Sequence, residues 1–238
     1  MKPQRTLLDQ ALRVDTATPM IRQYLAIKRH HGDVLLFYRM GDFYELFFDD
    51  AIAAAKTLDI NLTQRGMHGD EKIPMCGVPY HAHENYLTRL IKAGFHVAIC
   101  EQTEDPVQSR KSGGNKNVIN REVIRIITPG TLSETNLLQA DSNNFLASIA
   151  RSNDSFAIAW VDISTGQFRY QLVGSQGISG VLASINASEI LLSDHLHGNS
   201  DLENQWAFFA ETLHILPKSR FDTTNAVHRL HEYYQISD

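Results

Sequence analysis

The sequence contains no long hydrophobic run and little cysteine. No stretch of its 238 residues approaches the ~18 apolar residues that cross a bilayer, and residues 1–13 lack the apolar core of a signal peptide. Cys76 and Cys100 can form at most one bridge, and neither stands in a CxxC spacing. We therefore expect a globular, cytoplasmic protein with two reduced, buried thiols and no membrane contact.

A phosphate-binding loop is missing as well. The glycine-rich stretch SGGNK at 112–116 lacks the GxxxxGK[ST] spacing with which backbone amides hold nucleotide phosphates. No spacing of histidine and cysteine supports a nucleophile or a complete set of metal ligands. We expect no catalytic residue, no metal and no cofactor in this chain.

The net charge of −5 disfavours a generally basic nucleic-acid binder, but the charge is unevenly distributed. Residues 1–127 carry 17 Lys and Arg against 15 Asp and Glu, whereas residues 128–238 carry 5 against 12. This asymmetry predicts two domains with different partners, divided between residues 127 and 128.

Helices and strands alternate in the first half, which predicts a mixed α/β domain. Thr18 can cap a helix whose first turn contains Pro19, and Gly32 and Gly94 each end a helical pattern. The expected helices are 18–31, 49–58 and 82–93, the expected strands are 34–40, 60–64, 95–100 and 118–127, and the proline-containing stretch 71–82 and the polar stretch 104–117 are expected to be loops.

The second half predicts a ribonuclease-H-like domain that follows a hinge at TPGTL. The expected strands are 144–150, 156–163, 167–172, 189–192 and one near 206–209, and the expected helices are 179–185 and 224–234. Three strands linked by hairpins, followed by a helix and a strand, is the ribonuclease-H-like order. This is an analogy of fold, which carries no activity by itself.

An enzyme remains an alternative because of Asp162. It lies near the end of a long strand in WVDISTG, where ribonuclease-H-like nucleases begin a two-metal site, and such a site needs several converging carboxylates. Glu189 and Asp194 are the conceivable partners, but they stand at opposite ends of one expected strand, so both cannot lie beside Asp162. We therefore expect Asp162 to belong to the hairpin turn that follows it.

The stretch LLFYRMGDFYELFFDDA, residues 35–51, places Phe43 and Glu45 just after a glycine. Neighbouring aromatic residues suffice for a core, and Gly41 permits a tight turn. We expect Phe43 and Glu45 to face outward together, with Tyr44 between them pointing inward. An exposed Phe can act as a wedge that unstacks a base step from the minor groove, at a cost that is lowest where pairing is already faulty.

These motifs resemble the start of bacterial MutS mismatch-repair proteins. The resemblance is dense over about residues 18–131 and extends into the second half. It implies that residues 1–127 form a mismatch-recognition domain and residues 128–238 a connector domain with a ribonuclease-H-like fold. The segments that carry it are FYRMGDFYELFFDDA at 37–51, LTQRG at 62–66, IPMCGVPYHAHENYLTRLIKAGFHVAICEQTEDP at 73–106, REVIRIITPGT at 121–131 and VDISTGQF at 161–168.

Phe43 and Glu45 match the family's Phe-x-Glu pair without substitution. The resemblance implies that the Phe stacks on a mispaired base and that the Glu hydrogen-bonds this base, with Met40 and Asp42 flanking the wedge. A carboxylate close to phosphates is repelled, so Glu45 is expected to penalise intact duplex and to raise specificity more than affinity.

Several basic residues are expected to contact the DNA backbone. Arg65 in LTQRG and Arg121 resemble family positions that hold it. Arg110, Lys111 and Lys116, in the polar loop, are expected phosphate contacts on their charge rather than on a motif.

The resemblance also implies partners. The family's lever, clamp and ATPase domains would lie beyond Asp238, so we expect a monomeric fragment without ATPase activity, whereas the full-length protein is expected to be a dimer that uses ATP and Mg²⁺. The expected partners are double-stranded DNA with mismatches or small loops and, for the acidic second domain, a MutL-type protein. We expect it at the bacterial nucleoid, and a pure protein-interaction module remains a further alternative.

Overall fold

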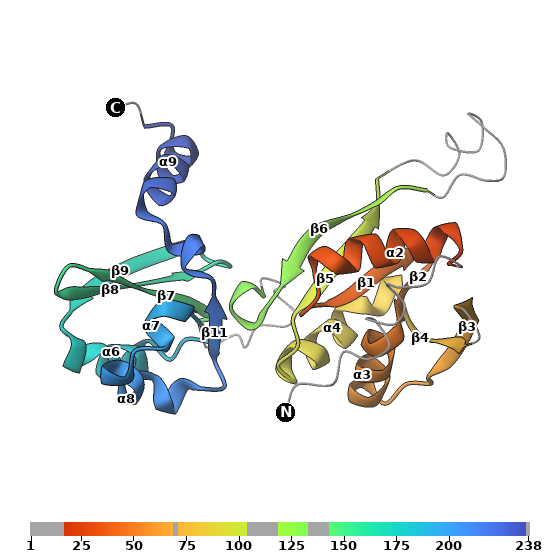
Figure 1. The fold of residues 1–238 in the computed structure, drawn as a ribbon, viewed down its shortest axis with the longest axis horizontal. Helices are drawn as coiled ribbons and strands as arrows, with labels where there is room; N and C mark the ends of the chain where they lie inside the picture. Colours follow the sequence, from red (N-terminus) through yellow and green to blue (C-terminus); the bar gives the residue numbers. More distant parts are fainter. Residues whose placement is uncertain (1–16, 69–70, 104–118, 133–142, 237–238) are drawn as a thin grey trace. The chain divides into compact units, whose positions relative to one another are not determined.

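A computed structural model describes residues 17–68, 71–103, 119–132 and 143–236 (Figure 1). The chain divides into two compact units, Met1–Thr128 and Pro129–Asp238, and each has its own mixed sheet flanked by helices. The expected two-domain α/β fold is therefore confirmed. Within the described ranges, no helix is long and apolar enough to span a membrane.

The first unit is built on a six-stranded sheet in the order β3-β4-β2-β1-β5-β6. Strand β1 runs parallel to β5, and the other neighbouring strands are antiparallel. The strands are β1 (Leu35–Met40), β2 (Phe43–Phe47), β3 (Thr63–His68), β4 (Glu71–Pro79), β5 (Val97–Gln102) and β6 (Arg121–Ile127), and the helices are α2 (Pro19–His30), α3 (Phe48–Leu58) and α4 (His83–Lys92), the last preceded by the 3-10 turn η1 (Tyr80–Ala82).

The expected helices of this unit are confirmed, but three strands differ from expectation. The strand expected over residues 60–64 lies further along the chain: residues 60–62 form no strand after the left-handed cap Asp59 of α3, and β3 begins only at Thr63. Residues 71–79 form β4 rather than a loop, since Pro74 lies beside an irregularity in the β3–β4 register, where a missing N–H is tolerated. Strand β2 was not expected, because its residues show no polar and apolar alternation. Both of its faces are largely covered, and four of its five residues are buried.

A buried ion pair ties α2 to α3. Lys28 Nζ lies 2.8 Å from Asp50 Oδ1, and both side chains are more than nine-tenths buried. The other Asp50 oxygen accepts hydrogen bonds from Tyr24 Oη at 3.1 Å and from the Leu36 amide at 3.0 Å. One carboxylate thus joins two helices to β1, with its hydrogen-bonding capacity largely used.

Both cysteines are free and buried in the first unit, as expected. Burial raises the pKa of Cys76 to about 12 and that of Cys100 to about 12. At neutral pH the two thiols are therefore protonated and pack as small apolar side chains.

The second unit has a five-stranded sheet in the order β11-β10-β7-β8-β9. Strands β7, β8 and β9 form an antiparallel meander, whereas β10 and β11 run parallel to β7. This is the ribonuclease-H-like order that the sequence predicts. The strands are β7 (Phe145–Ser152), β8 (Ser155–Asp162), β9 (Gln167–Val173), β10 (Glu189–Ser193) and β11 (Leu213–Leu216), and the helices are α6 (Ile178–Ile185), α7 (Asp194–His197), α8 (Glu203–Trp206) and α9 (Thr223–Tyr234).

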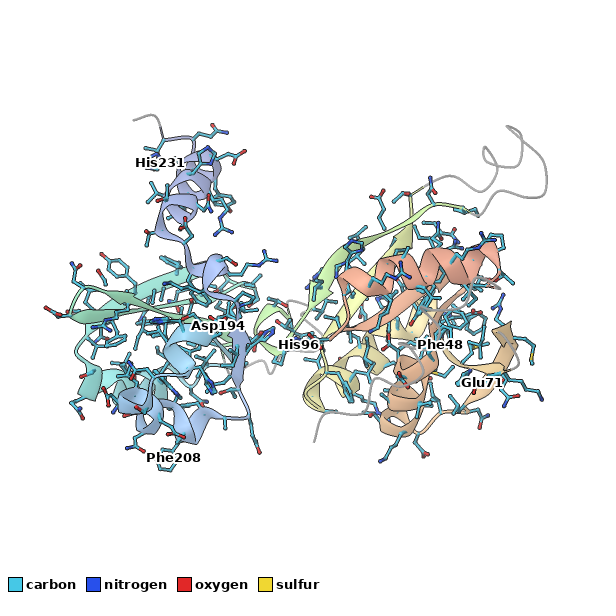
Figure 2. The ribbon with its side chains drawn as sticks, in the orientation of Figure 1. Phe48, Glu71, His96, Asp194, Phe208 and His231 are labelled. Carbon is cyan, nitrogen blue, oxygen red and sulfur yellow. The ribbon has the colours of Figure 1, made fainter. Side chains whose placement is uncertain are left out.

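The strand expected near residues 206–209 is wrong. That stretch is the end of α8 and the 3-10 turn η6 (Ala207–Phe209), and the fifth strand follows it as β11. Leu202 and Trp206, four residues apart, are buried in the core, while Phe208 is 93% exposed and points away from it (Figure 2). The spacing of the buried pair is helical. The aromatic residues of the stretch 206–209 suggested a strand instead.

Replacing Lys28 with Met is expected to lower the stability of the first domain by about 3–5 kcal/mol, because the Asp50 carboxylate stays buried without its cation. Hydrogen exchange of α2 and β1 amides measures this loss. Both tryptophans of the chain, Trp160 and Trp206, belong to the second unit, so the unfolding transition seen by tryptophan fluorescence should not move. A change below about 1 kcal/mol, the range of exposed ion pairs, would contradict the assigned role.

Candidate nucleic-acid interface

The candidate interface lies at the hairpin between β1 and β2. Met40 pairs with Phe43, so Gly41 and Asp42 form a two-residue turn. Gly41 has φ +59° and takes the first turn position, where a type II′ turn needs glycine. The turn fixes the register, which places Phe43 and Glu45 on one face of the sheet and Tyr44 on the other.

Phe43 is the exposed phenylalanine of this region. It is 48% exposed, whereas Phe37, Phe47 and Phe48 are at most 4% exposed. Phe43 begins β2, so its ring stands at the turn end of the hairpin, beside the half-buried Met40 and the exposed Asp42. The expectation that Phe43 faces outward is confirmed.

Glu45 differs from expectation, since it is only 9% exposed. It shares a face with Phe43 but lies further along the strand, opposite Tyr38 on β1 and Gly77 on β4. The idea that both side chains face outward together is therefore wrong for Glu45. Tyr44 is 2% exposed and points inward as expected.

Arg65 holds the Glu45 carboxylate. Its Nη1 donates to both carboxylate oxygens, and the bond to Oε2 measures 2.5 Å. Arg65 lies on β3, in the stretch where the β3–β4 register shifts, so its side chain crosses β4 to reach β2. The β4 residue paired with Glu45 is Gly77, so no β4 side chain stands directly beside Glu45 at this point of the sheet.

Two opposing effects act on the Glu45 pKa. Burial, the larger effect, raises the pKa above its ordinary value, because desolvation disfavours the charged form. The Arg65 charge and hydrogen bonds and the more distant Arg121 charge lower it. The ionisation of Glu45 thus depends on its cationic neighbours.

Arg121 is placed inside the domain rather than on its surface. It is 8% exposed, and its Nε donates to the Arg39 carbonyl at 2.7 Å while its Nη1 donates to the Ile119 carbonyl at 2.9 Å. Its guanidinium lies over the Tyr38 ring, 4.8 Å from the centroid. The sequence-based role at the DNA backbone is not what this geometry favours, because the side chain supports the last residues of β1 before the turn.

The opposite face of the hairpin is held by a second set of contacts. Tyr44 Oη donates to Glu101, and Arg39 lies over the Tyr80 ring, 3.3 Å from its centroid. The Tyr80 amide donates to the Asp42 carbonyl at 2.8 Å. The turn is therefore fixed from both faces of the sheet, which sequence reasoning missed because it depends on strand register. The expected phosphate contacts Arg110, Lys111 and Lys116 lie outside the described residues.

Asp162 takes the turn role that the sequence favours. It accepts hydrogen bonds from the Ser164 hydroxyl at 2.6 Å and the Ser164 amide at 2.9 Å. Burial alone would raise its pKa, but these bonds, with those from Thr165 and Asn144, outweigh burial and keep the pKa below its ordinary value. Glu189 instead accepts from Gly130 and His214. Among the residues that the structure describes, no cluster of three ligating side chains includes Asp162, and its hydrogen bonds are those of a turn residue.

Fold and site define a two-domain α/β protein whose first domain carries an exposed phenylalanine beside a carboxylate held by an arginine. Residues 18–136 match the family model MutS domain I, and residues 144–238 match MutS domain II. The chain belongs to the MutS family.

Similar proteins bear the name DNA mismatch repair protein MutS. That of Dinoroseobacter shibae is 52% identical over 223 residues, which cover 94% of this chain and 25% of the relative. The one from Nitrobacter winogradskyi is 48% identical over 225 residues, covering 92% and 25%, and the one from Rhizobium meliloti is 43% identical over 225 residues, covering 93% and 24%. The chain spans about a quarter of the length of these relatives.

Replacing Arg121 with Met is expected to cost the first domain about 2–4 kcal/mol, because the partly buried Arg39 and Ile119 carbonyls lose a charged donor. Hydrogen exchange in β1 and β6 measures the loss. Arg89→Met, which removes the same charge from an exposed position on α4, is the matched control and should leave stability within about 0.5 kcal/mol. Equal effects of the two substitutions would show that Arg121 does not support the hairpin.

Proposed function

We propose that the first domain recognises mispaired or unpaired bases in duplex DNA, as part of DNA mismatch repair. Phe43 enters the minor groove as the wedge, and Glu45 tests the base that the wedge displaces. The observation that carries the proposal is the exposure of Phe43, 48%, in a stretch whose other phenylalanines are buried. The process is that of the similar proteins, which are named DNA mismatch repair proteins.

The hairpin suits the mechanics of insertion. A wedge must unstack a base step and kink the duplex, at a cost of a few kcal/mol, so it has to be held rigidly against the strain. The turn before Phe43 is held by the Tyr80 amide, which follows β4, and by Arg121, which donates to the Arg39 carbonyl on β1. Because a mismatch has already weakened stacking and pairing, the same wedge enters there at a lower cost than in intact duplex.

Glu45 adds discrimination that the wedge alone lacks. An ionised carboxylate only accepts hydrogen bonds, and the minor-groove edge of an intact base pair presents mainly acceptors. Glu45 therefore opposes insertion into intact duplex and becomes favourable where a displaced base offers a donor. The nearby Arg65 offsets part of its repulsion from the phosphates.

For the complete protein we propose a dimer that uses ATP and Mg²⁺ in domains other than these two. The glycine-rich stretch SGGNK of this chain lacks the phosphate-binding spacing, so we place ATP binding outside these two domains. We propose that the second domain, with 12 acidic against 5 basic residues from 128 to 238, couples to other domains and to a MutL-type partner rather than to DNA.

Phe43→Ala in the full-length protein is expected to weaken binding to a mismatched duplex about tenfold to a hundredfold, the range of one base–aromatic stack, and to abolish bending. Titrations of labelled mismatched and matched duplexes at one stated salt concentration measure the loss. Phe208→Ala removes an equally large, 93% exposed phenylalanine from the second unit and is the matched control. Mismatch binding and bending that survive Phe43→Ala would overturn the wedge.

Glu45→Ala is expected to raise affinity for matched duplex several-fold and to leave mismatch binding similar or weaker, so the ratio of the two affinities falls. The control is Glu71→Ala, which removes an exposed carboxylate from β4 of the same sheet (Figure 2). If Glu45→Ala weakened binding to both duplexes equally, Glu45 would be a contact for affinity and not for discrimination.

A further inference from the structure

The Arg65–Glu45 ion pair has no role in the base stacking proposed for Phe43. Arg65 lies on β3 and Glu45 on β2, with β4 between them, and one nitrogen of Arg65 donates to both carboxylate oxygens. The Glu45 side chain is 11% exposed, whereas the Arg65 side chain is 41% exposed. The charge of the buried Glu45 carboxylate thus depends on an arginine that remains accessible to solvent and to an approaching duplex.

We propose that Arg65 sets mismatch specificity through Glu45, by keeping the Glu45 carboxylate in its ionised, acceptor-only form as the hairpin meets DNA. The inference deepens the proposed function and rests on it. Arg65 acts here as a positioning residue, because the base is tested by Glu45 and not by Arg65.

The protonation state of Glu45 determines what it can reject. Protonated, the carboxyl can donate to adenine N3 or thymine O2, which face the minor groove in every A·T pair, and intact duplex is then no longer penalised. Ionised, it meets these acceptors as a repelling group. DNA itself favours the protonated form, since phosphates raise the pKa of a nearby acid, and burial acts in the same direction.

Arg65 is the cation placed to oppose both effects. Among the residues that the structure describes, the charged and titratable groups on the Glu45 side are Arg65 from β3, Arg121 from β6 and Tyr38, its partner on β1. Arg121 donates elsewhere, to two backbone carbonyls, to the Gln23 side chain and to the Met40 sulfur. Burial raises the pKa of Tyr38 to about 12, so Tyr38 stays neutral. Of these three groups, Arg65 is the one that donates hydrogen bonds to the carboxylate.

A first test needs no DNA. The pKa of the Glu45 carboxyl is followed by carbon NMR in the wild type, in Arg65→Ala and in Lys56→Ala, which removes the same charge from an exposed position on α3. Arg65→Ala should raise the pKa of Glu45, and Lys56→Ala should not. An unchanged pKa in Arg65→Ala would overturn the inference, whatever the protein does with DNA.

A second test measures the ratio of mismatched to matched affinity between pH 6 and pH 8, at one salt concentration, in the full-length protein. The wild type should discriminate equally across this range. In Arg65→Ala this ratio of affinities should be about tenfold lower than in the wild type at pH 6, which corresponds to the free energy of one charged hydrogen bond. The ratio should return to the wild-type value toward pH 8, as Glu45 ionises. In the Glu45→Ala background, Arg65→Ala should leave the ratio unchanged at every pH, and Arg65→Lys should partly restore the wild-type profile.

The outcomes separate this inference from the proposed function. If the wild type itself does not prefer mismatched DNA, the proposed function fails. The wild type could instead discriminate while Arg65→Ala weakens binding to both duplexes equally at every pH and lowers the slope of log affinity against log salt concentration by about one. Arg65 would then be a phosphate contact, and only the inference about Arg65 would fail.

Discussion

The two-residue turn at Gly41 and Asp42 is the constraint on which the site depends. A turn of this length sets the register of β1 and β2, and side chains alternate along a strand, so Phe43 and Glu45 must share a face while Tyr44 takes the other. A slip of one residue would bury the wedge and expose Tyr44. Contacts from Tyr80 and Arg121 hold the strands on either side of this turn, so the exposed ring stands on a rigid support.

Asp50 and Glu45 in the first domain are buried carboxylates, and each is paired with a cation. Lys28 and Asp50 are both buried, their hydrogen bonds join two helices to β1, and their pairing is structural. Glu45 is also buried, but its partner Arg65 is partly open to solvent, so this pair can respond to what approaches it. The same physical cost of an unpaired buried carboxylate therefore stabilises the fold in one place and, as we propose, controls base recognition in the other.

Much of the fold could be predicted from the sequence, because caps and periodicity are local signals. Thr18 and Pro19 marked the start of α2, and three β-rich runs marked the β7–β9 meander. β4 was missed because its prolines suggest a loop until the strand beside it is known. The outward Phe43 was foreseen, yet the burial of Glu45 and its pairing with Arg65 were not, since they arise from three strands that meet only in the folded sheet.

The most direct test of base insertion is a photochemical crosslink to the mispaired base. A duplex with 5-iodouracil opposite guanine is irradiated in complex with the full-length protein, and the attached peptide is identified by mass spectrometry. Our account predicts attachment at Phe43 that falls sharply when the iodouracil is paired with adenine. Crosslinks that form elsewhere in the chain, or that form equally well in the matched duplex, would contradict it.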